Sequence, residues 1–233
     1  MKQLTSNTNP VIVSFASKGR EDYKKGQERL LQSIQANWTG DYWLHTLERD
    51  GELPSSVAFK HKPHDQCPYL FKFTMIQLMI EQGYKQIIWL DSSLYLEKNP
   101  MELLEGGVMA FHNLGHPLYK YISDQAAANL NCSSRLNDIP QTWGGAIGFD
   151  FNNEDVCELF DEIIEQAHRG SFDEGKSTRP EFIAHRHDQA VMSVIFHDYG
   201  IKLQPYGKIV THPHYLFPFE YGNDFYISHR PIV

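Results

Sequence analysis

Runs of consecutive apolar residues alternate along this chain with segments of helical periodicity. Short apolar runs are typical of strands buried on both faces of a parallel sheet, whereas apolar residues spaced three and four apart indicate amphipathic helices. The runs predict strands at residues 11–16, 42–47, 57–60, 87–90, 108–111, 142–149, 201–204 and 209–211. Helical spacing predicts helices at residues 23–37, 69–80, 101–104, 117–130, 152–168 and 188–198. This alternation predicts an α/β fold with a mostly parallel sheet.

Residues 170–177 match the phosphate-binding P-loop pattern letter for letter. That pattern works only where a buried strand enters the loop and a helix leaves it. Here a helix enters the segment, and Asp173 and Glu174 would repel a phosphate. We therefore interpret the segment as a flexible loop that closes over a ligand, with Gly170 ending the helix at residues 152–168.

The length and charge of the chain narrow its class. A chain of 233 residues with 13% aromatic residues is long enough for one well-packed domain over residues 1–233. The formal net charge of −8 disfavours polymeric nucleic acid as a partner. The three cysteines are widely spaced, and the sequence shows neither a signal-peptide pattern nor an apolar run near 20 residues. These features predict a cytoplasmic protein without a membrane span.

The strand predicted at residues 87–90 is followed directly by Asp91. Open α/β sheets bind ligands at the carboxyl ends of their strands, and a carboxylate placed there needs a cation or hydrogen-bond donors. Asp91 is therefore the first candidate for chemistry. This interpretation requires Asp91 to remain outside any internal ion pair.

Three further features are candidates, each with a structural alternative. Lys72 lies on the helix before the strand that ends at Asp91, and it is either a site residue or a solvated lysine. Glycines 144 and 145 lie in a predicted strand, where they allow the approach of either a ligand or a helix. Asp188 begins the predicted helix at residues 188–198 as either a site carboxylate or a helix N-cap.

The order of these motifs resembles the GT-A-fold nucleotide-sugar glycosyltransferases, and is closest in style to the glycogenin and bacterial galactosyltransferase-like branch. The shared motifs are a helix with Lys72, a strand followed by Asp91-Ser92-Ser93, a Trp-Gly-Gly strand, Asp188-Gln189 and a late histidine. The resemblance runs in short islands from about Val11 to His229. It implies a single-domain, Rossmann-like GT-A fold with a mixed, mostly parallel sheet flanked by helices. It also implies transfer of a sugar from a nucleoside-diphosphate sugar, expected to be a UDP-sugar, to an unidentified acceptor.

The resemblance also implies roles for individual residues. The residues matched to nucleotide-sugar binding are Phe15, Ala16, Ser17, Lys72, Asp91, Ser92, Ser93 and Arg230. Those matched to the donor sugar or acceptor are Trp143, Gly144, Gly145 and Gln189. Asp188 is matched to the catalytic acidic residue. If the reaction inverts the anomeric carbon, Asp188 is the expected general base; if it retains the configuration, Asp188 and Gln189 are expected to position the sugar.

One position departs from the family pattern. These families carry Asp-x-Asp after the strand, and Ser93 stands where the second aspartate is normally the main metal ligand. Serine is a weak ligand for Mn²⁺ or Mg²⁺, which prefer carboxylate oxygen. Either the chain works without a divalent cation, or Asp91, His229 and the diphosphate hold the ion together.

The sequence leaves other functions open. Ser93 is compatible with a non-catalytic protein of the same fold that binds a sugar nucleotide or a glycan. A nucleotidyltransferase would need a glycine-rich basic loop after the first strand, where residues 16–20 hold a single glycine. A metal hydrolase built on His185, His187 and Asp188 lacks a convincing partner motif.

Overall fold

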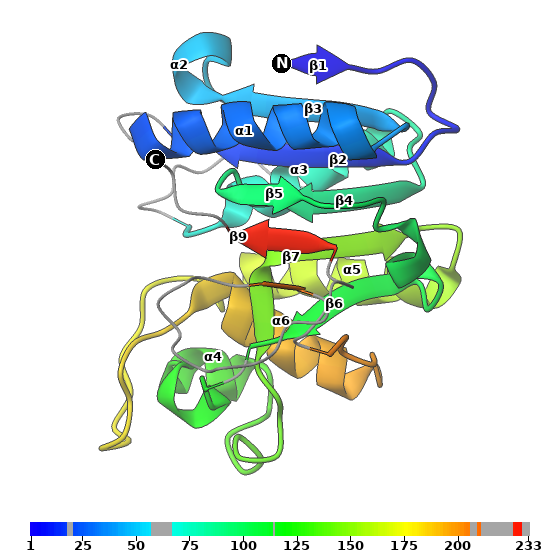
Figure 1. Ribbon diagram of the computed structural model, residues 1–233. Coiled ribbons are helices and arrows are strands. Elements are labelled where there is room, and N and C mark those ends of the chain that lie inside the picture. Colours follow the sequence, from blue (N-terminus) through cyan, green and yellow to red (C-terminus); the bar gives the residue numbers. More distant parts are fainter. Residues whose placement is uncertain (18–20, 57–66, 114, 206–208, 211–225, 230–233) are drawn as a thin grey trace.

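A mixed β-sheet forms the centre of the protein (Figure 1). The computed structural model describes residues 1–17, 21–56, 67–113, 115–205, 209–210 and 226–229. Within these ranges the central sheet has six strands, in the spatial order β1 (Lys2–Gln3), β3 (Asp41–Thr46), β2 (Val11–Ala16), β4 (Gln86–Leu90), β7 (Thr142–Asp150) and β6 (Val108–His112).

Four of these six described strands point in the same direction. β2 pairs in parallel with β3 and with β4, and β6 shares their direction because both β4 and β6 are antiparallel to β7. β1 is antiparallel to β3. The carboxyl ends of β2, β3, β4 and β6 consequently lie at one end of the sheet, as expected for a mixed, mostly parallel α/β sheet.

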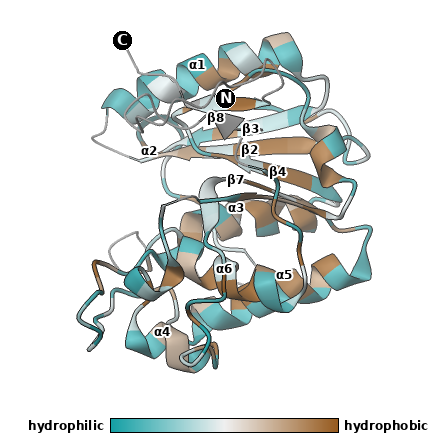
Figure 2. Ribbon diagram, turned by 60° about the horizontal axis from the view of Figure 1, so that its bottom comes forward, coloured by the Kyte–Doolittle hydropathy of each residue, from teal (hydrophilic) through white to brown (hydrophobic). Residues whose placement is uncertain are grey.

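Helices cover both faces of this sheet (Figures 1 and 2). The helices are α1 (Glu21–Asn37), α2 (Leu47–Asp50), α3 (Leu70–Glu81), α4 (Asp124–Asn129), α5 (Glu154–His168) and α6 (His187–Asp198), with 3₁₀ turns η1 (Met101–Leu104) and η2 (Leu118–Lys120). α1 lies on one face, and α3, α5 and α6 lie on the other. Alternate residues of β2 enter the two cores: Val11 and Val13 face α3, whereas Ile12 faces α1. The six residues of β2 are all buried, as the apolar run predicted.

A second, smaller sheet lies beside the end of β4. It consists of β5 (Leu94–Leu96), β9 (Ile227–His229) and β8 (Ile209–Val210), in the order β5-β9-β8. β9 runs antiparallel to β5, with His229 opposite Leu94. The small sheet therefore brings the backbone of His229 next to the turn that follows Asp91.

Most predicted elements are confirmed within a few residues, but two predictions are wrong. The helix predicted at residues 117–130 is broken into η2 and α4. The break occurs because the carbonyl of Tyr121 accepts a hydrogen bond from the Arg186 N–H, and that of Ile122 accepts one from the Arg179 guanidinium. Ser123 then caps α4 by accepting from the Ala126 N–H. Residues 201–204 form no strand, only an isolated bridge between Gln204 and Phe111.

Four short elements were not predicted: β1, α2, β5 and β9. Each has two to four residues, too few for a periodicity to be recognised. The strand predicted at residues 57–60 and residue Thr211 lie outside the described residues.

The segment that imitates a P-loop follows α5, and no strand leads into it. Gly170 ends α5 with a φ of 76°, a conformation that glycine adopts without strain. Further along, the Asp124 carboxylate accepts hydrogen bonds from the Ser177 hydroxyl and the Thr178 N–H. These contacts attach the segment to the start of α4, so its backbone is not arranged as a phosphate cradle.

The acid stability of the fold is expected to depend on Asp41, at the start of β3. Its buried carboxylate accepts hydrogen bonds from the Thr5 N–H and hydroxyl, the Ser6 N–H and the Tyr84 hydroxyl. Burial raises the pKa of Asp41, but these hydrogen bonds outweigh it and lower the pKa to about 2. The carboxylate thus stabilises the fold above the unfolded-state pKa near 4, and this stabilisation is lost as the pH falls towards 2.

We expect the difference in unfolding free energy between wild type and Asp41→Asn to shrink by about 2 kcal/mol between pH 6 and pH 2. Urea unfolding followed by circular dichroism measures this difference. Asp161→Asn, at an exposed position of α5, is the matched control. A difference that stays constant over this pH range would contradict the assignment.

Candidate functional site

A buried ion pair connects three elements near the carboxyl ends of the parallel strands. The ammonium group of Lys72, on α3, lies 2.5 Å from Asp188 Oδ2, on α6. Lys72 Nζ also donates a hydrogen bond to the carbonyl of Gly144, on β7, at 2.6 Å. Both charged side chains are only 2% exposed. The alternative that Lys72 is a solvated helix residue is therefore wrong.

Asp91 follows β4 at this same end of the sheet. Its N–H donates to the carbonyl of Gly145 at 2.8 Å, which continues the pairing of β4 with β7. Residues 89 and 91 lie on the same side of an extended chain, and Trp89 Nε1 donates to Asp91 Oδ1 at 2.7 Å. Within the described residues, Asp91 forms no ion pair and Oδ2 accepts no hydrogen bond. In this part of the chain the carboxylate is therefore not locked inside an internal ion pair.

The environment of Asp91 raises its pKa to about 6. The main cause is burial, which disfavours the charged form. The Lys72 ammonium and the Trp89 hydrogen bond lower the pKa in part, and the Asp188 carboxylate raises it further. Asp91 therefore changes its charge near neutral pH, a property common at functional sites.

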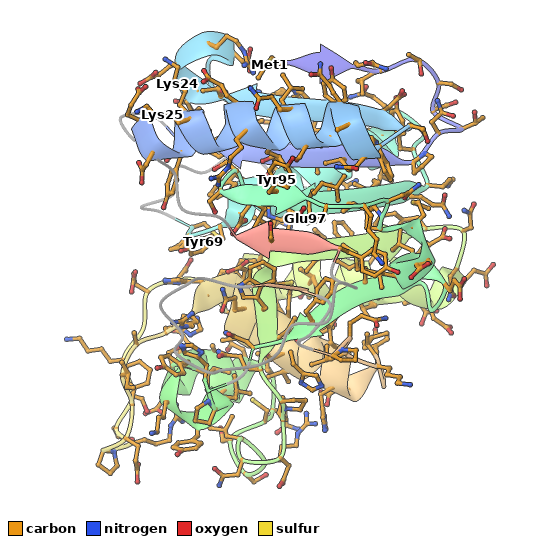
Figure 3. All side chains as sticks on the ribbon, in the orientation of Figure 1. Met1, Lys24, Lys25, Tyr69, Tyr95 and Glu97 are labelled. Carbon is orange, nitrogen blue, oxygen red and sulfur yellow. The ribbon has the colours of Figure 1, made fainter. Side chains whose placement is uncertain are left out.

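Two aromatic rings lie around the Lys72 ammonium. Its Nζ is 5.5 Å from the ring centroid of Trp89 and 5.6 Å from that of Tyr69, within the range of cation–π attraction. Tyr69 precedes α3 with a φ of 63° and is 38% exposed. Figure 3 shows it at the end of the sheet where β2 and β4 finish. Tyr69 therefore extends the site from the buried ion pair to the surface.

Gly144 of β7 allows α6 to approach the sheet closely, and Gly145 leaves room for the Trp143 ring. A Cβ atom on Gly144 would lie 2.7 Å from the Gln189 side chain and 3.1 Å from Asp188 Oδ2. A Cβ atom on Gly145 would lie 2.3 Å from the Trp143 ring. The distances of 2.7 Å and 2.3 Å are shorter than real Cβ contacts, so side chains of this chain fill the space beside the glycines. The alternative in which the strand packs closely against a helix is therefore the one that the structure shows at Gly144.

Asp188 lies inside the first turn of α6 and does not cap it. The N-cap is Arg186, which makes no side-chain cap hydrogen bond. His187 has a φ of 39°, and its Nδ1 donates to the carbonyl of Phe172 at 2.8 Å. The N-cap alternative for Asp188 is therefore wrong, and its carboxylate faces Lys72 instead.

The structure thus brings together Lys72, Asp91, Gly144, Gly145, Asp188 and Gln189. Gln189 Oε1 accepts hydrogen bonds from Asn113 at 3.2 Å and Arg186 at 3.4 Å. Trp143 is half-buried beside Gly145.

The remaining predicted site residues do not belong to this group of six. Phe15 and Ala16 are buried at the end of β2, where the Phe15 ring stacks on Phe71 at 4.5 Å. Ser17 and Ser93 are half-buried, and Ser92 is buried. His229 belongs to β9, but its side chain is not described, and Arg230 lies outside the described residues.

Three residues that sequence reasoning missed belong to the site. Arg29, on α1, donates to the carbonyl of Ser93 at 3.0 Å and places a cation beside the turn that follows Asp91. Trp89 and Tyr69 surround the Lys72 ammonium. Arg29 occupies a half-buried position of an amphipathic helix, and nothing in the sequence distinguishes it from a solvated arginine. Trp89 lies two residues before Asp91, and residues at this spacing lie on the same side of a strand. The sequence could therefore have indicated that Trp89 contacts Asp91.

The described side chains supply only part of the ligand set that a divalent cation needs. No group of three or more His, Cys, Asp and Glu side chains that could hold a metal ion occurs within the described residues. Asp91 Oδ2 can supply one carboxylate ligand, and the register of β9 places the backbone of His229 opposite Leu94. Whether the side chain of His229 completes a site therefore stays a prediction.

The ion pair is expected to be essential for stability. Lys72→Met leaves the Asp188 carboxylate buried without its cation, and breaking such a pair costs about 3–5 kcal/mol. The double variant Lys72→Met/Asp188→Leu is expected to lose less, because it removes both charges. Urea unfolding at neutral pH measures both losses. Arg169→Met, which breaks the exposed pair with Glu165, is the control and is expected to lose less than about 1 kcal/mol. An equally small loss for Lys72→Met would contradict the importance of the pair.

Comparisons with known proteins identify the fold. No protein-family model and no curated protein matches the sequence. The structure is similar to that of the WbbM bifunctional glycosyltransferase, with a TM-score of 0.55 and 15% identity over 91% of this chain, which spans 41% of the WbbM structure. It is also similar to a glycosyltransferase involved in glycosylation of the major capsid of PBCV-1, with a TM-score of 0.52 and 12% identity over 94% of this chain and 93% of that one. Mouse xyloside xylosyltransferase 1 gives a TM-score of 0.52 and 12% identity over 95% of this chain and 97% of that one. The chain therefore has a GT-A-like glycosyltransferase fold.

Proposed function

We propose that this protein is a glycosyltransferase that takes a sugar from a nucleoside-diphosphate sugar, with a UDP-sugar as the expected donor. The observation that carries the proposal is the Asp91 carboxylate at the end of β4, beside the buried pair of Lys72 and Asp188. Fold similarity to three glycosyltransferases supports it.

The charges of the site favour a donor that arrives with a cation. Lys72 is neutralised by Asp188, so an ionised Asp91 leaves the three groups with a net charge of −1. A diphosphate would be repelled by this charge unless a cation lay between them. Mn²⁺ or Mg²⁺ held by Asp91 Oδ2, the diphosphate and His229 would supply that cation and stabilise the departing diphosphate. Arg29 and Arg230 are candidates for further contacts with the diphosphate.

Asp188 is proposed to act near the reacting sugar. Its Oδ2 is already engaged by the Lys72 ammonium, so a general-base role would rely on Oδ1. The buried pair supports instead a role in which Asp188 and Gln189 position the donor sugar, as in a retaining reaction. In that role Lys72 orients Asp188, and the carbonyl of Gly144 orients Lys72.

A second candidate is a non-catalytic protein that binds a sugar nucleotide or a glycan on the same fold. The observation that favours it is Ser93, because a neutral hydroxyl stands where the family pattern has a carboxylate. Donor hydrolysis separates the two functions. A transferase releases nucleoside diphosphate slowly from its donor without an acceptor, whereas a binding protein does not.

Asp91→Ala is expected to abolish donor binding. A thermal-shift panel of UDP- and GDP-sugars, with Mn²⁺ or with EDTA, measures binding. A donor at 100 times its Kd stabilises a protein by about 2.7 kcal/mol, which gives a readily detected shift. The exposed Asp161→Ala is the matched control, with wild-type shifts expected. If Asp91→Ala keeps both the shift and the hydrolysis of the donor, the proposed site is wrong.

The cation-dependent affinity for the donor is expected to rise about tenfold between pH 5 and pH 7. The reason is that Asp91, with its pKa near 6, binds a cation only when ionised. Titration calorimetry with a UDP-sugar and Mn²⁺ measures the affinity. A UDP-sugar is a better probe than UDP, whose terminal phosphate also titrates near pH 6. An affinity that does not change over this range would contradict the role of Asp91 as a cation ligand.

A further inference from the structure

A cavity of about 400 Å³ lies between the segment that follows β6 and the segment that leads into β7. Its polar lining comes from His112, Asn113, His116, Asn137, Asp138 and Gln141. The other lining residues are mainly proline, leucine and isoleucine. A volume of this size holds a small organic ligand.

The cavity adjoins the proposed donor site through one side chain. Asn113 Nδ2 donates to Gln141 Oε1, on the cavity wall, and to Gln189 Oε1, both at 3.2 Å. Gln189 in turn follows Asp188 and packs against Gly144. Asn113 directly follows β6, whose carboxyl end lies at the same end of the sheet as Asp91. A ligand in this cavity would therefore lie next to the residues proposed to hold the donor sugar.

One buried polar atom of a lining residue lacks a partner. Gln141 is only 4% exposed, and its Nε2 makes no hydrogen bond to the described residues. A buried amide donor without a partner costs free energy, and a ligand hydroxyl would accept from Nε2 once the neighbouring atoms move aside to expose it. Its Oε1 is held by Asn113, so the orientation of the amide is set by the protein.

The composition of the wall favours a neutral, hydroxyl-bearing ligand. Amide groups both donate and accept hydrogen bonds, as sugar hydroxyl groups do. None of the described residues that line the cavity is a lysine or an arginine, whereas Asp138 contributes a carboxylate. Phosphate or an anionic sugar would meet no fixed positive charge there. Apolar side chains in the same wall can pack against the C–H faces of a sugar ring.

We propose that this cavity binds the acceptor, and that the acceptor is a neutral oligosaccharide. The proposal rests on the proposed glycosyltransferase function and adds the substrate class. Gln141 and Asn113 bind hydroxyl groups of the acceptor, and Asn113 connects the acceptor to Gln189. This arrangement places an acceptor hydroxyl beside the donor sugar.

Saturation-transfer NMR with neutral di- and trisaccharides of glucose, galactose, mannose and N-acetylglucosamine tests the proposal. Wild-type protein is expected to transfer magnetisation to at least one of these sugars. Asn137→Trp, at an exposed position of the rim, places a large ring over the cavity and is expected to reduce that signal at least fivefold. Ser134→Trp is the matched control, because Ser134 is exposed on the neighbouring turn and does not line the cavity.

Gln141→Met provides a second test, because it removes the amide while keeping a similar shape. It is expected to weaken the sugar affinity about tenfold, the effect of losing one hydrogen bond of about 1.4 kcal/mol. Retained signal in Asn137→Trp, unchanged affinity in Gln141→Met, or no signal from wild type with any of the sugars would overturn the proposal.

Failure of this proposal is distinguishable from failure of the proposed function. Donor binding and donor hydrolysis need no acceptor, so they test the Asp91 site alone. Wild-type protein that hydrolyses a donor but binds none of the sugars retains the transferase function and refutes the neutral acceptor. Wild-type protein that binds the sugars without binding or hydrolysing any donor refutes the assignment of the cavity as an acceptor site.

Discussion

The buried ion pair between Lys72 and Asp188 is the interaction on which the candidate site depends. A lone buried charge is far more costly than a paired one, so each residue requires the other to remain in place. Because Lys72 also binds the carbonyl of Gly144, the pair joins α3, α6 and β7 at one point. The absence of a side chain on Gly144 leaves the space in which Asp188 and Gln189 reach that point.

The same constraint shapes the electrostatics of Asp91. Burial and the nearby Asp188 disfavour its charge, while Lys72 and the Trp89 N–H favour it. Since Lys72 is already engaged by Asp188, its charge offsets only part of the burial. The result is a carboxylate that is easily neutralised near pH 6 and that gains from a cation brought by a ligand. This property supports the proposal of a donor whose diphosphate arrives with a metal ion.

The start of α6 is held by the segment at residues 171–187, which has little regular structure of its own. His185 is buried; its Nδ1 accepts from the Ser123 N–H and its Nε2 donates to the carbonyl of Ser171. Burial lowers the pKa of His185 to about 4, so it stays neutral at physiological pH. Together with the hydrogen bond from His187 to Phe172, these contacts fix the turn that presents Asp188.

None of the helices in the described ranges is long and apolar enough to span a membrane.

Local sequence determined the elements whose burial is repetitive. The apolar run of β2, the helical periodicity of α5 and the glycine that ends α5 each act within a few residues, so the sequence alone predicted them. The position of Asp91 after a buried strand was predicted in the same way. Its order relative to the lysine, the glycines and Asp188-Gln189 also pointed to the GT-A fold.

Tertiary structure decided what depends on residues far apart in the chain. Lys72 and Asp188 are separated by 116 positions, and only the packing of α3 and α6 on β7 shows that they pair rather than face solvent or cap a helix. The helix predicted at residues 117–130 breaks because Arg179 and Arg186 bind its carbonyls from a distant segment. β9 forms because β5 offers it a partner. Periodicity records which side of an element is buried, but it carries no information about which distant group supplies the missing hydrogen bond or charge.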